Sequence, residues 1–328
     1  MKLRLVVLAA LGVLLGALLV ARQDLHALAH ALRLAGWTAL LAITLIHLVP
    51  MALCGLAWRA QLAQPPASIA RYAWFRWMRE TGGVTPMGGE LLGVRVMALS
   101  GIKVGLAIAT TVVDVTIEMS AQIVFTLLGL AILVVERPHS ALVAWTLAGL
   151  VVTLPLLAGL VLAPRLGLFR LLERFADTLA AGRGWHGFGA GDIPAHIHAI
   201  YGRHRRILAA LAIHLAAWLV GIAEAGAALA LMGVPLRLDS LLVLESLSYA
   251  LRSAAFFVPA AAGVQEGGYV LLGALLGIGP EFALALSLLK RARELLLSGL
   301  GLLAWQAAEG GRLWRRLRTP VEAQAGED

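Results

Sequence analysis

The sequence predicts an all-α integral membrane protein with about six transmembrane helices and two broken or re-entrant elements. Hydrophobic residues make up 60% of the 328 positions and charged residues only 14%, whereas a soluble domain averages roughly 25% charged residues. Several apolar runs reach the roughly 20 residues that a transmembrane helix needs. Two charged stretches also repeat along the chain, which indicates two related halves.

In the first part of the chain, a basic, aromatic stretch and a glycine-rich break interrupt the expected spans, which cover residues 3–21, 36–58, 104–135 and 141–163. After the second span, arginines alternate with tryptophan and tyrosine, a mixture typical of the lipid headgroup layer. The glycine-rich segment 81–90 then precedes a short apolar helix that ends near Gly101. Because this helix is too short to cross a bilayer, we interpret the element as re-entrant.

The second part of the chain follows a hydrophilic loop, and its expected spans cover residues 207–232 and 281–306. Between these spans, an apolar segment that starts at Ser240 is broken by Pro259 and Gly263. Proline removes a backbone donor and glycine frees the backbone, so a helix is expected to stop there. We interpret this element as a second re-entrant hairpin. The alternative is two full spans, which would give eight in all.

Loop charges predict the orientation of a single membrane domain at residues 1–310. Arginine is concentrated at the N-terminus, in the stretch 59–103, in the loop 164–206 and in the tail 311–328, which is first basic and then acidic. Placing these segments, and both termini, in the cytoplasm satisfies the positive-inside rule. Three crossings separate the two broken elements, so they enter from opposite sides and we expect an inverted repeat.

A shift of 176 positions superposes two repeat-like units, at about residues 81–135 and 257–306. It places Glu90 on Glu266, Gly101 on Gly277, Asp114 on Lys290 and Glu118 on Glu294. A charge at the centre of a membrane helix costs about 2.5–3.5 kcal/mol on insertion scales, and such residues usually serve a function. The candidates for a substrate pathway are therefore Glu90, Arg95, Asp114, Glu118, Arg252, Glu266, Lys290, Arg293 and Glu294.

The charged residues of the third and sixth spans lie at similar depth, where opposite charges can pair. We expect Glu118 to contact Lys290. The functional interpretation is a midplane site or gate between two facing helices, and the structural alternative is a salt-bridge lock between them. Arg95 and Arg252 lie on short apolar helices, where an arginine suits a phosphate or carboxylate. The alternative for these two is pairing with a nearby glutamate.

Other chemistries have no matching pattern. Glu90 and Glu266 could simply cap their short helices, and His47, His214 and Glu224 are single polar groups that a neighbour is expected to satisfy. The sequence has no Walker A, G-x-S-x-G or H-E-x-x-H motif, and its loop histidines lack zinc-ligand spacing. We therefore expect no metal, no cofactor and no enzymatic activity. The net charge of +8 follows from membrane topology and indicates no nucleic-acid partner.

Two motifs carry a resemblance to a known family: Pro86-Met-Gly-Gly-Glu90 with Arg95, and Pro259 with Gly263-Val-Gln-Glu266-Gly. They resemble the flippase-like membrane domain of lysylphosphatidylglycerol synthases. The run that begins Asp114-Val-Thr-Ile-Glu118 is most similar to the hopanoid-biosynthesis-associated HpnL branch of that family. The likeness covers most of the chain.

The resemblance implies lipid translocation in the bacterial inner membrane. The headgroup of a hopanoid or another polyisoprenoid-derived lipid would cross by alternating access around the charged midplane site. Membrane lipids would be the partners, together with lipid-biosynthesis proteins. The alternative is a non-transporting accessory or scaffold protein, with the arginine-rich inner loop as its partner surface. The sequence leaves the lipid, the driving force and the oligomeric state open.

Overall fold

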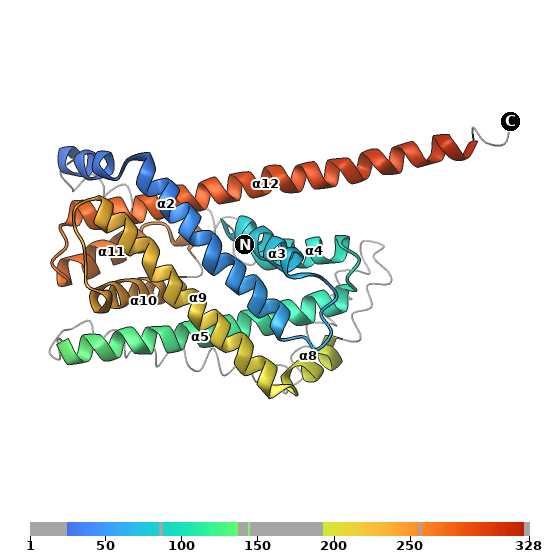
Figure 1. Cartoon of the computed structure of the whole chain (residues 1–328), viewed down its shortest axis with the longest axis horizontal. Coiled ribbons are helices and arrows are strands. Elements are labelled where there is room, and N and C mark those ends of the chain that lie inside the picture. Colours follow the sequence, from blue (N-terminus) through green and yellow to red (C-terminus); the bar gives the residue numbers. More distant parts are fainter. Residues whose placement is uncertain (1–24, 85–87, 137–143, 145–192, 256–257, 325–328) are drawn as a thin grey trace.

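The computed structural model describes residues 25–84, 88–136, 144, 193–255 and 258–324, and the regular elements in these ranges are all helical (Figure 1). The α-helices are α2 (Leu25–Ala60), α3 (Ile69–Thr81), α4 (Gly88–Leu99), α5 (Val104–Glu136), α8 (Ile193–Tyr201), α9 (His204–Leu231), α10 (Leu238–Ala254), α11 (Val264–Leu275) and α12 (Pro280–Gln324). Two 3-10 helices, η1 (Gly82–Val84) and η3 (Pro259–Ala261), lie in the two breaks. The predicted all-α class is confirmed.

Three of the described helices are long and apolar enough to cross a membrane: His26–Ala60 in α2, Val104–Glu136 in α5 and His204–Leu231 in α9. They correspond to the second, third and fifth predicted spans. The predicted span 3–21, nearly all of the span 141–163 and most of the loop 164–206 lie outside the described residues. Helix α12 exceeds the predicted sixth span and continues through most of the predicted tail (Figure 1).

The boundaries and order of the helices match between the two halves under the 176-residue shift. Helices α4 and α11 each have 12 residues, and both of their ends match under the shift. Helices α5 and α12 also begin at equivalent positions, and α2 and α3 correspond in order to α9 and α10. The repeat therefore covers α2–α5, which we call the first half, and α9–α12, the second half. It extends beyond the predicted start at residue 81.

The turns after α4 and α11 match in their hydrogen bonds as well. Gly101 and Gly277 adopt positive φ angles of 87° and 78°. The next residues, Ile102 and Ile278, each donate a backbone N–H to the carbonyl five positions back, at 3.2 and 2.8 Å. This is the Schellman arrangement, in which glycine tolerates the left-handed conformation that ends a helix. Each half thus passes from its short helix to its long one by the same turn.

Equivalent helices of the two halves run in opposite directions. Where α2 packs on α9, His47 lies beside Glu224, and the carbonyl of Leu62, just beyond α2, accepts a bond from Arg206 near the start of α9. Residue numbers therefore rise along one helix while they fall along the other, and the two helices are antiparallel (Figure 1). The two halves are accordingly inverted, in the orientation that the predicted crossings require.

Each break folds into a helical hairpin, α3 with α4 and α10 with α11. In the first hairpin, a Cβ atom on Gly89 would lie 2.3 Å from the carbonyl oxygen of Arg79, so glycine is needed for this close approach. In the second, the hydroxyl of Tyr269 donates to Glu245 at 2.8 Å. A 12-residue helix is about 18 Å long, short of the roughly 30 Å hydrocarbon core. These lengths favour re-entrant elements over eight full spans.

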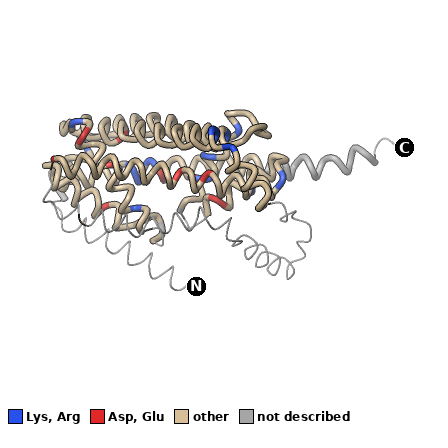
Figure 2. Tube along the Cα trace, turned by 90° about the horizontal axis from the view of Figure 1, so that it is seen from below, with Lys and Arg blue, Asp and Glu red and all other residues tan. Residues whose placement is uncertain are grey.

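Each hairpin packs against the long helix of the other half. Gln122 of α5 donates from Nε2 to Oγ of Ser253 in α10 at 2.6 Å. In the mirrored contact, Trp77 of α3 donates from Nε1 to the carbonyl of Leu297 in α12 at 3.0 Å. Figure 2 shows acidic and basic residues along the middle of the bundle as well as at its ends. The interlocked hairpins thus bring charges of both halves to a common centre.

Candidate functional site

Each half places one arginine–glutamate pair at the centre of the bundle. In the first half, Arg76 of α3 donates from both Nη atoms to the carboxylate of Glu118 in α5, at 2.8 Å each. In the second half, Arg252 of α10 donates to Glu294 in α12 at 2.5 Å. Both pairs join residues 42 positions apart, and the 176-residue shift superposes them. The repeat therefore reproduces a charge-assisted interaction and not only helix boundaries.

Both pairs line one cavity of about 490 Å³ between the halves. Its charged lining consists of four arginines and four glutamates, and a histidine lies among them: Arg76, Arg252, Arg291, Arg293, Glu80, Glu118, Glu224, Glu294 and His47. Apolar side chains, among them Trp77, Trp218 and Leu295, complete the wall. Small-ligand sites typically measure about 300–1,000 Å³. A cavity with this lining suits a ligand that has polar and apolar parts.

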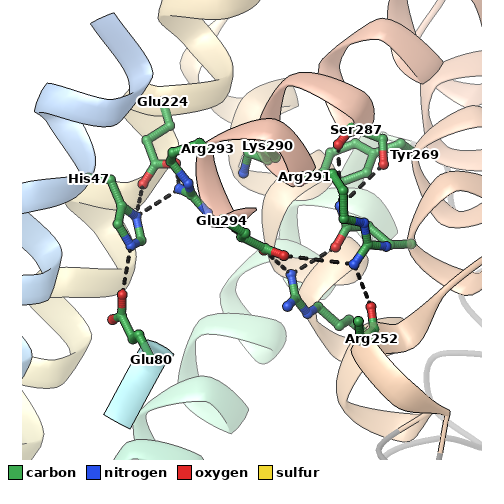
Figure 3. Close-up of polar contacts among 12 residues, drawn as sticks. His47, Glu80, Glu224, Arg252, Tyr269, Ser287, Lys290, Arg291, Arg293 and Glu294 are labelled. Carbon is green, nitrogen blue, oxygen red and sulfur yellow. Dashed lines mark hydrogen bonds and ion pairs between the residues drawn. The ribbon is translucent and has the colours of Figure 1, made fainter. Parts of the chain in front are cut away.

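Arg252 is the most accessible of the four cavity arginines. Its side chain is 32% exposed, against 12% for Arg76, 18% for Arg291 and 3% for Arg293. Besides its glutamate partner, it donates from Nη1 to Oε1 of Gln265 at 2.8 Å. Figure 3 shows Arg252 on the side of the network where Arg291 and Glu294 also converge. It is therefore the arginine best placed to meet a ligand.

Glu266 caps its helix and also pairs with a cavity arginine, although it does not itself line the cavity. It accepts the backbone N–H of Gly263 at 2.7 Å and so caps the start of α11. Its other oxygen accepts from Arg291 at 2.8 Å, and Arg291 also donates to the carbonyl of Ala260 at 2.6 Å. Glu266 thus holds a cavity arginine against the second break.

Glu90 and Arg95, the remaining predicted residues of the first break, lie apart from the cavity. Glu90 is 3.5 Å from Nε of Arg79, and the guanidinium of Arg95 lies over the ring of Trp305 at 6.0 Å. Neither Glu90 nor Arg95 belongs to the cavity lining. The predicted site residues that do line the cavity are Glu118, Arg252, Arg293 and Glu294.

Asp114 and Lys290 occupy equivalent positions, but the structure buries them in separate ion pairs behind the cavity. The fully buried Asp114 accepts from Nη1 of Arg79 at 2.7 Å and lies 3.1 Å from Nε2 of His214. Lys290 pairs with Glu245 and also lies over two tyrosine rings. Pairing lowers the penalty for burying these charges. Their surroundings favour a structural role for both.

The predicted contact between Glu118 and Lys290 is wrong. Glu118 accepts from Arg76 and from Arg79, at 2.8 Å in each case, while Lys290 pairs with Glu245. The reason is the position of α3, which the sequence suggested for the headgroup layer. Arg76 and Arg79 point inward, and Tyr72, Phe75 and Met78 are fully buried. Two arginines of α3 therefore occupy the carboxylate of Glu118, and the lysine of α12 pairs elsewhere.

Sequence reasoning missed five charged or titratable residues of the cavity: His47, Arg76, Glu80, Glu224 and Arg291. For Arg76 the signal was present, because the 176-residue shift places it on the predicted Arg252. His47 and Glu224 had no such signal, and only the packing of α2 on α9 brings them within 2.7 Å. Glu80 adjoins them, 3.1 Å from the other ring nitrogen of His47 (Figure 3).

The family of the lysylphosphatidylglycerol synthase TM region has a profile that matches residues 4–301. The chain belongs to this family. It is a family of membrane domains tied to lipid metabolism or translocation. The matched range includes the first half, the second half up to residue 301 within α12, and the whole charged cavity. Comparison with curated proteins and with solved structures gives no significant match.

In this member of the lysylphosphatidylglycerol synthase family, one group of described residues has the composition of a metal site. Ligand atoms of Cys54, Glu118 and His214 lie within 4.8 Å of one another. Both carboxylate oxygens of Glu118, however, already accept bonds from Arg76 and Arg79. Two adjacent guanidinium charges oppose a divalent cation, so we assign no metal to this group.

Proposed function

We propose that the protein moves lipids between the leaflets of the bacterial inner membrane, by alternating access to the cavity between its two inverted halves. The carrying observation is the matched pair of ion pairs, Arg76–Glu118 and Arg252–Glu294, which face that single cavity from opposite halves. Inverted repeats around one central site are the architecture of many secondary transporters, which rock one repeat against the other. Membership in a family tied to lipid metabolism or translocation supports the same function.

The cavity dimensions support entry of a headgroup alone. A volume of about 490 Å³ is that of a small-ligand site, so we expect the hydrocarbon tails to remain in the bilayer. The lipid-facing side chains suit this arrangement, because Trp37, Leu41 and Leu45 on α2 are 84%, 61% and 56% exposed. The headgroup would accept hydrogen bonds from arginines that otherwise donate to glutamates.

The charge of the lining favours a neutral or zwitterionic headgroup. Four arginines and four glutamates line the cavity, and their charges balance when His47 is neutral. A headgroup with several negative charges would leave the four glutamates with fewer cationic partners and would be repelled by them. A hopanoid or another polyisoprenoid-derived lipid, which the sequence resemblance indicates, is our candidate substrate.

Leaflet-resolved lipid movement in proteoliposomes tests the proposal. Purified protein would be reconstituted with a panel of labelled phospholipids and hopanoids, and protein-free liposomes would give the background rate. We expect faster movement of at least one lipid in the presence of folded protein. If no lipid moves faster, the proposal fails and the accessory role takes its place. No described residue favours that role now, because its expected partner surface, the loop 164–206, lies mostly outside the described residues.

A further inference from the structure

His47 is a polar link between the two halves at the cavity. It belongs to α2 in the first half, and its Nε2 atom lies 3.1 Å from Glu80 in the same half. Its Nδ1 atom lies 2.7 Å from Oε1 of Glu224 and 2.7 Å from Nη1 of Arg293, both in the second half (Figure 3). The side chain is 16% exposed and lines the cavity, so a proton can reach it.

The two contacts of Nδ1 require opposite protonation states. Glu224 can only accept, so a hydrogen bond to it needs a proton on Nδ1. Arg293 can only donate, so a hydrogen bond from it needs a lone pair on Nδ1. The neutral ring carries one N–H, and only the imidazolium can donate to Glu80 and Glu224 together. His47 is thus built to exchange one second-half partner for the other when it gains or loses a proton.

The repeat does not reproduce the contact between His47 and Arg293 at the equivalent positions. Shifted by 176 positions, His47 falls on Ala223 and Arg293 falls on Ile117, and neither equivalent residue can titrate. The paired arginines and glutamates of the cavity wall, in contrast, occur in both halves. An interaction that occurs in both halves stabilises the inward-open and outward-open conformations alike. An interaction that occurs in one half alone can stabilise one of these conformations over the other.

We propose that His47 binds the proton that drives lipid movement, an inference that rests on the proposed function. In the protonated state the imidazolium donates to Glu80 and Glu224 and ties α2 to α9. In the neutral state Nδ1 accepts from Arg293 of α12, and the tie to Glu224 is lost. One proton binds to Nδ1 from water on one side of the membrane and leaves from Nδ1 to water on the other.

The charged groups around His47 fit this cycle. From α3 it faces Glu80, which Arg76 holds at 3.0 Å. From α9 it faces Glu224, and from α12 it faces Arg293, which also pairs with Glu224. Arg293 and Glu224 can therefore satisfy each other when either is released by the ring, so neither charge is left buried alone.

Proton binding is tested directly by nitrogen NMR of histidine-labelled protein in liposomes. The His47→Gln variant identifies the signal of this ring by its disappearance, and His204→Gln, at the exposed start of α9, is the matched control. We expect the ring to convert from imidazolium to neutral imidazole as the pH is raised. A ring that keeps one protonation state at every pH at which the protein stays folded would overturn the proposal. If His47→Gln does not fold, Glu224→Gln assigns the signal, because loss of this neighbour shifts it.

Coupling is tested by imposing a pH gradient on the proteoliposomes. Wild-type protein and His204→Gln should move lipid faster in the direction of the gradient, whereas His47→Gln should show the same rate with and without it. If the rate of lipid movement by wild-type protein is the same with and without the gradient, the proton coupling is refuted, but the proposed translocation is not. If the ring titrates but no lipid moves, the proposed function fails, and the coupling fails with it.

Discussion

Glu118 and Glu294 lie 176 positions apart, and each accepts hydrogen bonds from an arginine 42 positions before it. The same shift turns the buried Asp114 into the buried Lys290. The two halves thus have the same arginine–glutamate pair at the cavity, but opposite charges at the buried position behind it. Charges that line the cavity and charges that hold the helices together can therefore be separated by mutation.

The first prediction concerns the fully buried Asp114. Asp114→Asn should lower the free energy of unfolding by about 3 kcal/mol, because breaking a buried ion pair leaves its partner charge uncompensated. We expect the low end of the range for such pairs, since Arg79 keeps Glu118 and lies near Glu90. Unfolding in lipid nanodiscs measures the change. The control is Asp239→Asn, whose partner Arg237 is 84% exposed, and a much smaller loss is expected there.

The outcome also decides the role of Asp114 in transport. A variant with wild-type unfolding and no lipid movement would make Asp114 a transport residue. Low protein yield together with normal movement per folded molecule would place it in the scaffold, as its absence from the cavity lining indicates.

The second prediction concerns the pair of Lys290 and Glu245, which are 3% and 1% exposed. Lys290→Met and Glu245→Gln should each destabilise the protein by about 3–5 kcal/mol, because each leaves an unpaired buried charge. The double variant should lose less than the sum of the two losses, which a double-mutant cycle measures. Strictly additive losses would show that the two side chains do not interact.

The elements that sequence could predict are those whose signals are local. Apolar length set the limits of α5, and the glycine and proline breaks located α4 and α11 to within a few residues. The inward position of α3 could not be predicted, because its alternation of arginine and aromatic residues suits a headgroup layer and a charged interior equally well. For the same reason Arg76 and Arg79 were missed as the partners of Glu118.

The site shows the same limit. Arg252, Glu294 and Arg293 were found because charges in apolar helices are rare. Their pairing partners required tertiary contacts over long sequence separations, such as the 177 positions between His47 and Glu224. A search for residues related by the 176-residue shift would have recovered Arg76, but no single-sequence pattern specifies how α2 packs on α9.

The third prediction concerns orientation. The start of α9, at His204, and the loop after it, at Arg237, lie at opposite ends of this helix. In a Cys54→Ala background, Arg237→Cys should react with a membrane-impermeant maleimide from outside, and His204→Cys only after the membrane is opened. Both native side chains are exposed, so access does not limit labelling. The reverse pattern would invert the proposed topology, and labelling of both from one side would contradict a spanning α9.

The central claim is that lipid headgroups pass through the cavity between the halves. Its most direct test compares leaflet-resolved lipid movement by wild type, Arg252→Gln and Arg237→Gln in proteoliposomes. Arg252 faces the cavity and Arg237 lies on a surface loop, while the chemical change is identical. We expect Arg252→Gln to slow movement by about tenfold or more, since a charge-assisted bond is worth about 1.5–3 kcal/mol, and Arg237→Gln to match wild type. Equal rates for all three proteins, each folded, would contradict the cavity as the lipid path.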